Sequence, residues 1–270
     1  MRFDVTVSID GPYANRALAK VARQSGAANL FITQNGDWPA QGIGTESRLF
    51  SCDGLVCTNP VYYARNRDRW TSALVPNDVD VGRFPPGVGN RRALGLPARV
   101  PIVLMVSALM DSKRVVEGIR AVARVPDVML VLAGEGEMRR EVDEAAASLL
   151  GLRYRRISLP FDQMPNLYRC ADVFLHMSLF ESFGNVYVEA LASGLPIVAH
   201  DGDVTRWILG AHAELVDTTD EDATADAIKR SFGRGGEVDR VAAAMGFSWK
   251  LAATRFREFA VQVVERLRRV

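Results

Sequence analysis

The chain is poor in the residues on which several classes of function depend. It has three cysteines in 270 residues, and Cys52, Cys57 and Cys170 lack the spacing of metal ligands. It also has only three histidines, which weakens any zinc-based or histidine-based catalytic scheme. We find no apolar run of membrane-spanning length and no charged-then-apolar signal sequence. These absences favour a reducing, cytoplasmic setting and predict no metal site.

The charge of the chain is nearly balanced. It has 33 Lys and Arg against 32 Asp and Glu, and its net charge is +1. A nucleic-acid binder usually shows a concentrated positive field, so we expect no nucleic-acid partner. With 48% hydrophobic and 24% charged residues, the composition is that of a soluble globular protein. The length is sufficient for one large or two small domains.

Residues 1–86 alternate short apolar runs with helical segments. We expect strands at 3–9, 29–33 and 54–58, with helices at 15–24 and 60–70. This pattern predicts a parallel sheet covered by helices. Arg65, Arg67 and Arg69 lie on the second helix. They form either a solvated face, which we favour, or a basic face that rests on anionic lipid at the inner side of a membrane.

The second half is more regular. Turn formers are dense at 74–87, so we place a linker at 87–98 between a first domain (1–86) and a second domain (99–250). Five strands are expected, at 101–108, 128–133, 172–177, 195–199 and 213–216, and helical patterns alternate with them. They predict a doubly wound α/β sheet, in which ligands bind at the carboxyl ends of the strands. A final helix, 251–270, is expected to pack back at the domain junction.

The stretch from Glu181 to Glu189 is the most informative part of the chain. It predicts a tight loop that opens into a helix, which Gly194 and Pro196 then end. The first amides of a helix have no intrahelical partner and bind anions such as phosphate, and Gly184 allows a close approach to the backbone. The carboxylates on either side accept hydrogen bonds from hydroxyls. A nucleotide-sugar, with phosphates between two polyols, has the matching shape.

Glu181 and Glu189, eight positions apart, resemble the Glu-x7-Glu signature of the retaining GT-B glycosyltransferases, in particular the bacterial glycosyltransferase group 1 (GT4) family. Residues around the pair also match the family pattern: Gly184, Ala190, Gly194, Leu195 and Pro196. The linker is similar to the segment that joins the two halves of GT-B enzymes. The resemblance implies two Rossmann-like domains, the first of them incomplete and the second a complete doubly wound parallel sheet.

Two further loops carry the resemblance. Ser107-Ala108-Leu-Met-Asp-Ser-Lys113-Arg114 is similar to the family's Gly-Arg-Leu-x3-Lys-Gly loop, so Lys113 inherits a diphosphate contact. The family arginine falls on Ala108, and Arg114 is the candidate to replace it. Gly134, in Gly-x-Gly, indicates a tight strand-to-helix turn first and a ligand contact second. Leu159 falls where the family places the nucleotide base. His176 and His200 are interpreted as structural hydrogen-bonding residues.

The resemblance begins near Phe3, and family members are longer at the front of the first domain. Residues 1–100 contain no histidine, although the family has one near the reacting sugar. The segment 33–38 stands where a loop with that histidine is expected. Its Gln34, Asn35 and Asp37 are able to bind a sugar, but no role is carried over to them. The donor half therefore looks complete, and the acceptor half looks trimmed.

The resemblance implies metal-independent transfer of a sugar from a UDP- or GDP-linked donor to a saccharide or glycolipid acceptor, as in polysaccharide biosynthesis, without a cofactor. Glu181 and Lys113 take the catalytic roles. The donor-binding residues are Glu189, Ser182, Phe183, Gly184, Asn185, Val186, Ser107, Arg114, Gly134 and Leu159. Three alternatives stay open: a non-catalytic nucleotide-sugar-binding subunit completed by a like or unlike partner, a nucleotide-sugar epimerase, and a structural or interaction protein.

Overall fold

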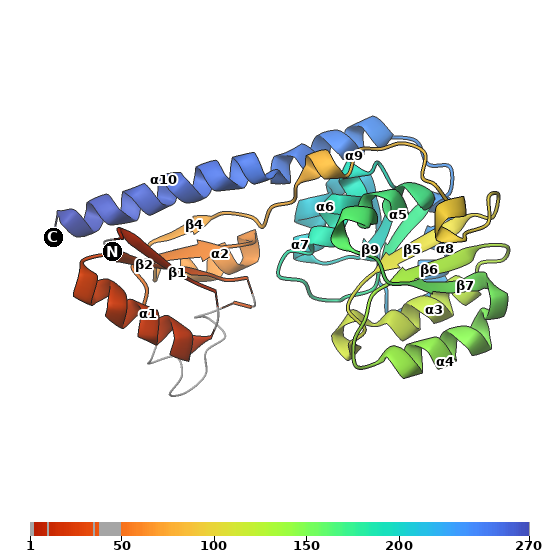
Figure 1. Ribbon diagram of the computed structural model, residues 1–270, viewed down its shortest axis with the longest axis horizontal. Coiled ribbons are helices and arrows are strands. Elements are labelled where there is room, and N and C mark those ends of the chain that lie inside the picture. The colour runs from red at the N-terminus through yellow and green to blue at the C-terminus, as the bar shows by residue number, and fades with distance from the viewer. Residues whose placement is uncertain (1–2, 10, 35, 38–49, 270) are drawn as a thin grey trace. The chain divides into compact units, whose positions relative to one another are not determined.

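The computed structural model describes residues 3–9, 11–34, 36–37 and 50–269. The chain divides into two compact units (Figure 1). The first combines Met1–Asp78 with Phe247–Val270, and the second is Val79–Gly246. Each unit is built on a parallel sheet, which confirms the expected α/β class. Residues 87–98, expected as a linker, lie in the second unit by this division.

The first unit contains a four-stranded parallel sheet in the order β1-β2-β3-β4. Its strands are β1 (Val5–Ser8), β2 (Ala28–Ile32), β3 (Gly54–Cys57) and β4 (Ser72–Leu74). Its helices are α1 (Pro12–Ser25), α2 (Pro60–Asn66) and α10 (Trp249–Arg268). The strands follow one another across the sheet in chain order, so each connection moves the chain one place along it.

Helix α10 belongs to the core of the first unit, although it ends the chain. Phe259 and Val263 of α10 are buried in one cluster with Leu30 and Val56. The adjacent residue on each strand points to the other face, where Phe31 and Leu55 pack with aromatic residues of and after α2. This alternation is what a strand buried on both faces requires. The helix thus closes one face of the sheet and α2 covers the other.

The second unit contains a six-stranded sheet in the order β10-β9-β8-β5-β6-β7, with every pairing parallel. Its strands are β5 (Ile102–Val106), β6 (Met129–Ala133), β7 (Tyr154–Ile157), β8 (Val173–His176), β9 (Ile197–His200) and β10 (Ala213–Val216). Its helices are α3 (Val115–Ala123), α4 (Arg139–Leu149), α5 (Met164–Cys170), α6 (Asn185–Ala192), α7 (Asp203–Leu209), α8 (Glu221–Ser231) and α9 (Glu237–Ala244).

Helices cover both faces of this sheet, as a doubly wound fold requires. Helices α4 and α8 both contact α3 on one face, whereas α9 packs against α6 on the other. Figure 1 shows α3 and α4 below the sheet and α5 and α6 above it. The central strands are almost wholly apolar and buried, as the continuous apolar runs in the sequence predicted.

The expectation of five strands in this half was wrong, because β7 makes a sixth. Its sequence is Tyr-Arg-Arg-Ile, and it lies at the edge of the sheet, where one side of the ladder has no neighbour. Arg156 is nevertheless largely covered, because its guanidinium hydrogen-bonds Asp143 of α4 at 3.0 Å and Glu135 at 2.6 Å. An edge strand that satisfies its charges by ion pairs has no apolar signature. The short strand β4 and the helices α7 and α9 were also missed.

Candidate active site at the switch point of the second sheet

The strand order of the second unit reverses between β5 and β8. From β5 the chain proceeds outward to β6 and β7, then returns to β8 and proceeds the other way. The loops that leave β5 and β8 therefore diverge at the carboxyl edge, which is where open α/β sheets bind ligands. The loop after β5 leads to Lys113, and the loop after β8 leads to Glu181.

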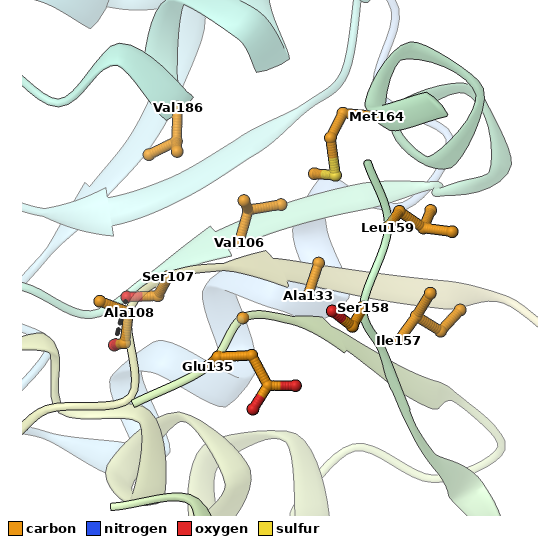
Figure 2. A pocket seen from close by; sticks show the side chains of 11 residues that line it. Val106, Ser107, Ala108, Ala133, Glu135, Ile157, Ser158, Leu159, Met164 and Val186 are labelled. Carbon is orange, nitrogen blue, oxygen red and sulfur yellow. Dashed lines mark hydrogen bonds between the residues drawn. The ribbon is translucent and has the colours of Figure 1, made fainter. Parts of the chain in front are cut away.

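A pocket of about 390 Å³ opens at this edge (Figure 2). It is formed mainly by the carboxyl ends of β5, β6 and β7, and its lining is more apolar than polar. The lining residues are Val106, Ser107, Ala108, Ala133, Gly134, Glu135, Ile157, Ser158, Leu159, Met164 and Val186. Four residues predicted for the donor, Ser107, Gly134, Leu159 and Val186, thus come together around one cavity. Ile157 and Ser158 belong to the same predicted base-binding segment as Leu159, whereas the sequence had given no reason to include Met164.

Gly134 sits where the β6 loop presses against the β5 loop. A Cβ at this position would collide with the carbonyl oxygen of Ser107. The same two loops are joined by main-chain hydrogen bonds from Ser107 N to Ala133 O (3.0 Å) and from Leu109 N to Glu135 O (2.9 Å). The glycine is therefore needed for loop packing, as the tight-turn interpretation expected, and this packing forms one wall of the pocket.

Glu181 has two hydrogen-bond donors on a single oxygen. Its Oε1 accepts from Nζ of Lys113 at 2.6 Å and lies 2.8 Å from Nε2 of His176. The carboxylate is largely covered, with 12% of its side chain exposed. Burial alone would raise its pKa, but hydrogen bonds and positive charge from His176 and Lys113 lower it to about 2. Glu181 is thus a firmly ionised carboxylate at neutral pH.

His176, at the end of β8, is fixed by aromatic neighbours. Its ring lies parallel to that of Phe174 at 6.3 Å and meets the ring of Tyr187 edge-on at 5.0 Å. Only 3% of the residue is exposed. The expectation that His176 is a hydrogen-bonding residue agrees with its position. The sequence did not indicate that its partner would be Glu181.

Glu189 occupies a different environment, on the second turn of α6. Its Oε2 accepts a 2.6 Å hydrogen bond from the hydroxyl of Tyr168, which α5 supplies. Burial raises the pKa of Glu189, and the bond from Tyr168 offsets part of that rise. The two glutamates therefore differ in kind: one carries an ion pair, and the other is a covered carboxylate with a neutral partner.

The residues at the start of α6 differ in whether a ligand could reach their side chains or only their backbone. Gly184 adopts a left-handed conformation (φ 85°), and a Cβ there would lie 2.6 Å from the ring of Tyr187. Asn185 is exposed at the first position of the helix, whereas Ser182 is half-buried. Phe183 is buried and meets the ring of Trp207 edge-on at 6.0 Å. A ligand at this helix end would therefore reach Phe183 through its backbone.

Arg114 lies apart from the pocket lining. It adopts a left-handed conformation (φ 52°), and its Nε is 3.7 Å from the Glu117 carboxylate. The family pattern has glycine at this position, and glycine is the residue that adopts this backbone conformation most readily. The lining position that corresponds to the family arginine remains Ala108, which is exposed. Arg114 is held beside α3 rather than beside Ala108.

In segment 33–38, Thr33 and Asp37 have structural partners, whereas Gln34 is exposed. Asp37 is fully buried and binds Arg65 at 3.0 Å and Asn66 at 2.8 Å. Arg65 is thereby tied to the core of the first unit rather than simply solvated. Asn35 and Trp38 lie outside the described residues. His200 pairs with Thr218 at the ends of β9 and β10, in agreement with the structural role expected for it.

Neither a metal centre nor a membrane span is found in the described part of the chain. Within residues 3–9, 11–34, 36–37 and 50–269, no three His, Cys, Asp or Glu side chains gather as metal ligands. Over the same residues, no helix is long and apolar enough to cross a membrane. Cys52, Cys57 and Cys170 are all free.

Comparison with known proteins connects this geometry to a family. The family model described as glycosyl transferases group 1 matches residues 89–236, which include the pocket and both glutamates. The lipopolysaccharide core biosynthesis glycosyltransferase LpsE of Rhizobium meliloti (strain 1021) is 30% identical over 224 residues. That alignment covers 81% of this chain and 63% of LpsE, so the chain spans less than two thirds of the length of this relative.

Solved structures agree on the fold. Sucrose-phosphate synthase from Thermosynechococcus elongatus superposes with a TM-score of 0.82 at 22% identity, over 98% of this chain and 74% of that one. HepE of Anabaena, solved in complex with UDP-glucose, gives a TM-score of 0.75 at 19% identity, over 99% and 79% of the two chains. These likenesses confirm the expected GT-B fold with two parallel-sheet α/β domains.

Proposed function

The chain belongs to the glycosyl transferases group 1 family, and we propose that it transfers a sugar from a UDP- or GDP-linked donor to a saccharide or lipid-linked acceptor with retention of configuration. One observation carries the proposal. At the switch point of the second sheet, an apolar pocket borders the start of α6, and two unlike carboxylates flank that start: Glu181 in the loop before it and Glu189 in the helix. Each of these parts suits one part of a nucleotide-sugar. The UDP-glucose complex of HepE supports this choice of donor class.

The nucleotide would occupy the pocket. Leu159, Ile157 and Met164 offer apolar surface for a base, and Ser107 and Gly134 offer main-chain polar groups at the opposite wall. A lining that is apolar with a few polar groups is the usual composition of a small-molecule site. Uracil and guanine both fit that description, so the proposal covers both classes of donor.

The diphosphate would lie between the first turn of α6 and Lys113. The amides of 183–186 start a helix, where the backbone dipoles favour negative charge. Lys113 is 23% exposed and is held by a single carboxylate contact, so its ammonium can turn to a phosphate. Negative charge that develops on the leaving nucleotide would be stabilised by these groups, and we therefore propose transfer without a metal.

The two carboxylates would bind hydroxyl groups on either side of the phosphates. We assign Glu189 to the ribose and Glu181 to the transferred sugar. Glu181 is then an orienting group. The acceptor oxygen attacks the anomeric carbon on the face from which the phosphate departs, the bond from that carbon to the phosphate oxygen breaks, and the acceptor proton passes to the departing phosphate. The products are the glycoside, with retained configuration, and the nucleoside diphosphate.

A second candidate function is a nucleotide-sugar-binding subunit without transferase activity of its own. The observation that favours it is Ala108, which stands where the family has an arginine, while Arg114 lies beside Glu117. One of the usual phosphate cations is thereby missing from the pocket rim. Such a subunit would bind the donor as proposed and would need a partner for the transfer.

Incubation of the protein with UDP- and GDP-sugars, with and without simple saccharide acceptors, tests the proposal by release of nucleoside diphosphate. We expect release with at least one donor. Lys113→Met should abolish it, whereas Lys229→Met, which removes an exposed lysine of α8, should not. Donor binding without release in any mixture would favour the subunit. Absence of both binding and release would refute the proposed function.

A further inference from the structure

Glu181 and the diphosphate of the proposed donor both require the ammonium of Lys113. In the structure, Nζ of Lys113 and Nε2 of His176 both contact Oε1, at 2.6 and 2.8 Å. Under the proposed function, the ammonium of Lys113 turns to the donor diphosphate. Glu181 then loses one of these two contacts at the moment when it must be ionised and correctly oriented. A largely buried carboxylate that loses its partners is costly to keep ionised.

His176 is built so that it stays. Lys113 ends a flexible four-carbon chain on the loop after β5 and is 23% exposed. His176, by contrast, ends a central strand with 3% exposure, between Phe174 and Tyr187. Its buried imidazole therefore has much less freedom to move than the ammonium of Lys113. One contact to Oε1 is therefore exchangeable and the other is fixed.

We propose that His176 is a positioning residue that holds Glu181 in its sugar-binding orientation while Lys113 is engaged with the donor phosphates. This inference rests on the proposed function and adds to it a division of labour between the two contacts to Oε1. Lys113 serves the phosphates, and His176 serves the sugar indirectly, through Glu181. The imidazole touches Glu181 and does not itself take part in bond making.

The division of labour makes the effects of substitution specific. Loss of Lys113 should weaken binding of UDP and UDP-glucose alike, because both carry the diphosphate. Loss of His176 should weaken only the part of binding that depends on the sugar. A merely structural role of His176 would disturb the loop and the start of α6 together, and it would lower the affinity for both ligands.

The test measures dissociation constants of UDP and UDP-glucose, and of GDP and GDP-mannose, by calorimetry for His176→Leu and His176→Gln. The amide of glutamine can still donate a hydrogen bond to Oε1, whereas leucine fills the space without a donor. His200→Leu is the matched control, because His200 ends the neighbouring strand β9 and bonds Thr218 rather than Glu181. Melting temperatures show whether each variant is folded.

We expect His176→Leu to bind the sugar nucleotide about tenfold or more weakly, with unchanged affinity for the bare nucleotide, because hydrogen bonds to charged groups have this magnitude. His176→Gln should recover most of the loss, and His200→Leu should show none. The inference is refuted if the leucine variant keeps the wild-type ratio of the two affinities, or if the glutamine variant recovers nothing. Failure of the wild type to bind any of the four nucleotides would instead refute the proposed function.

Discussion

The two sheets of this chain share an architecture and differ in strand order. Both are parallel, and helices pack on both. In the first unit the described strands run in chain order, and the loops after β2 and β3 close on each other, where Thr33 and Thr58 hydrogen-bond. In the second unit the order reverses at β5 and β8, and a pocket opens beside the reversal. The reversal of the strand order thus marks the carboxyl edge at which this pocket lies.

The buried polar residues of the two units also differ. In the first unit they satisfy one another: Asn15 bonds Ser8, and Asp37 bonds Asn66. In the second unit, Glu181 and Glu189 also have partners, but these partners differ and give the two carboxylates different acidities. Paired polar groups stabilise a fold, whereas groups with unlike environments can divide the work of a binding site. The following predictions test this contrast, ordered by their expected effect on donor binding.

The largest effect should come from the glycine that joins the two loops of the pocket. Gly134→Ala places a Cβ against the carbonyl oxygen of Ser107, so one loop must move. We expect affinity for UDP to fall about 100-fold or more, because displacements near 1 Å have effects of this size at functional sites. Gly235→Ala is the control, since a Cβ there meets nothing within 4 Å. Equal affinities of the two variants, measured by calorimetry, would contradict the assigned pocket.

A smaller loss is expected when the covered carboxylate of α6 is removed. Glu189→Ala takes away the proposed acceptor of the ribose hydroxyls and leaves the hydroxyl of Tyr168 without its partner. We expect affinity for UDP and for UDP-glucose to fall together, by about tenfold. Glu144→Ala, at an exposed position of α4, serves as the control. Unchanged calorimetric affinity in Glu189→Ala would remove the assignment of this residue.

The pH dependence of donor binding should arise from protonation of Glu189 and not of Glu181. Burial raises the pKa of Glu189, so its carboxylate gains a proton first as the pH falls, whereas Glu181, with a pKa of about 2, stays ionised. We therefore expect affinity for UDP-glucose to decline as the pH approaches the raised pKa of Glu189. Glu189→Gln cannot titrate and should show a flatter profile. An identical decline in this variant would assign the pH dependence elsewhere.

The pKa shifts of Glu181 and Glu189 should affect the pH dependence of the free energy of unfolding in opposite ways. Because the pKa of Glu181 is depressed, its contribution is present above the pKa of an unfolded Glu and is lost as the pH falls toward about 2. The raised pKa of Glu189 favours the fold at low pH, and this contribution is lost as the pH rises through that pKa. The loss of the free energy of unfolding on acidification, followed by circular dichroism, should therefore be shallower than wild type in Glu181→Gln and steeper in Glu189→Gln.

Substitutions in the core of the first unit are expected to leave donor binding unchanged. Phe259→Ala on α10 empties a buried position beside Leu30 and Val56, which should lower the free energy of unfolding of this unit by about 3–5 kcal/mol. Val261→Ala, at a half-exposed position of the same helix, should cost much less. Calorimetry below the unfolding temperature should give wild-type affinity for UDP in both variants. A large loss in Phe259→Ala would show that the first unit contributes to the nucleotide site.

The sequence was sufficient for most of the fold and for four residues that line the pocket, but not for the contacts that the candidate site residues make. Continuous apolar runs indicated the buried strands, because parallel strands covered on both faces need no alternation. The edge strand β7 was not predicted, because its two arginines conceal it and the partners of Arg156, Asp143 and Glu135, are brought near only by the fold. Strand β4 is three residues long and offers no pattern.

Four pocket-lining residues could be predicted from the motifs around them, whereas the hydrogen-bond partners of Glu181 and Glu189 could not. Ser107, Gly134, Leu159 and Val186 were named from separate stretches, and they line one pocket. Tyr168 carries no motif, and its hydroxyl reaches Glu189 from a helix that precedes it by 21 residues in the chain. His176 ends an apolar strand, where a lone histidine is most often structural. Its contact with Glu181 depends on the path of the loop between them, which no spacing rule describes.

Hydrogen exchange with and without UDP, read by mass spectrometry on the wild-type chain, tests the central claim that the nucleotide site lies at the switch point of the second sheet. We predict slower exchange in peptides that cover 107–114, 133–138, 157–160 and 181–190, and no change in peptides that cover β1 to β4. Protection confined to the first unit, or saturating UDP without protection at these four segments, would contradict the claim.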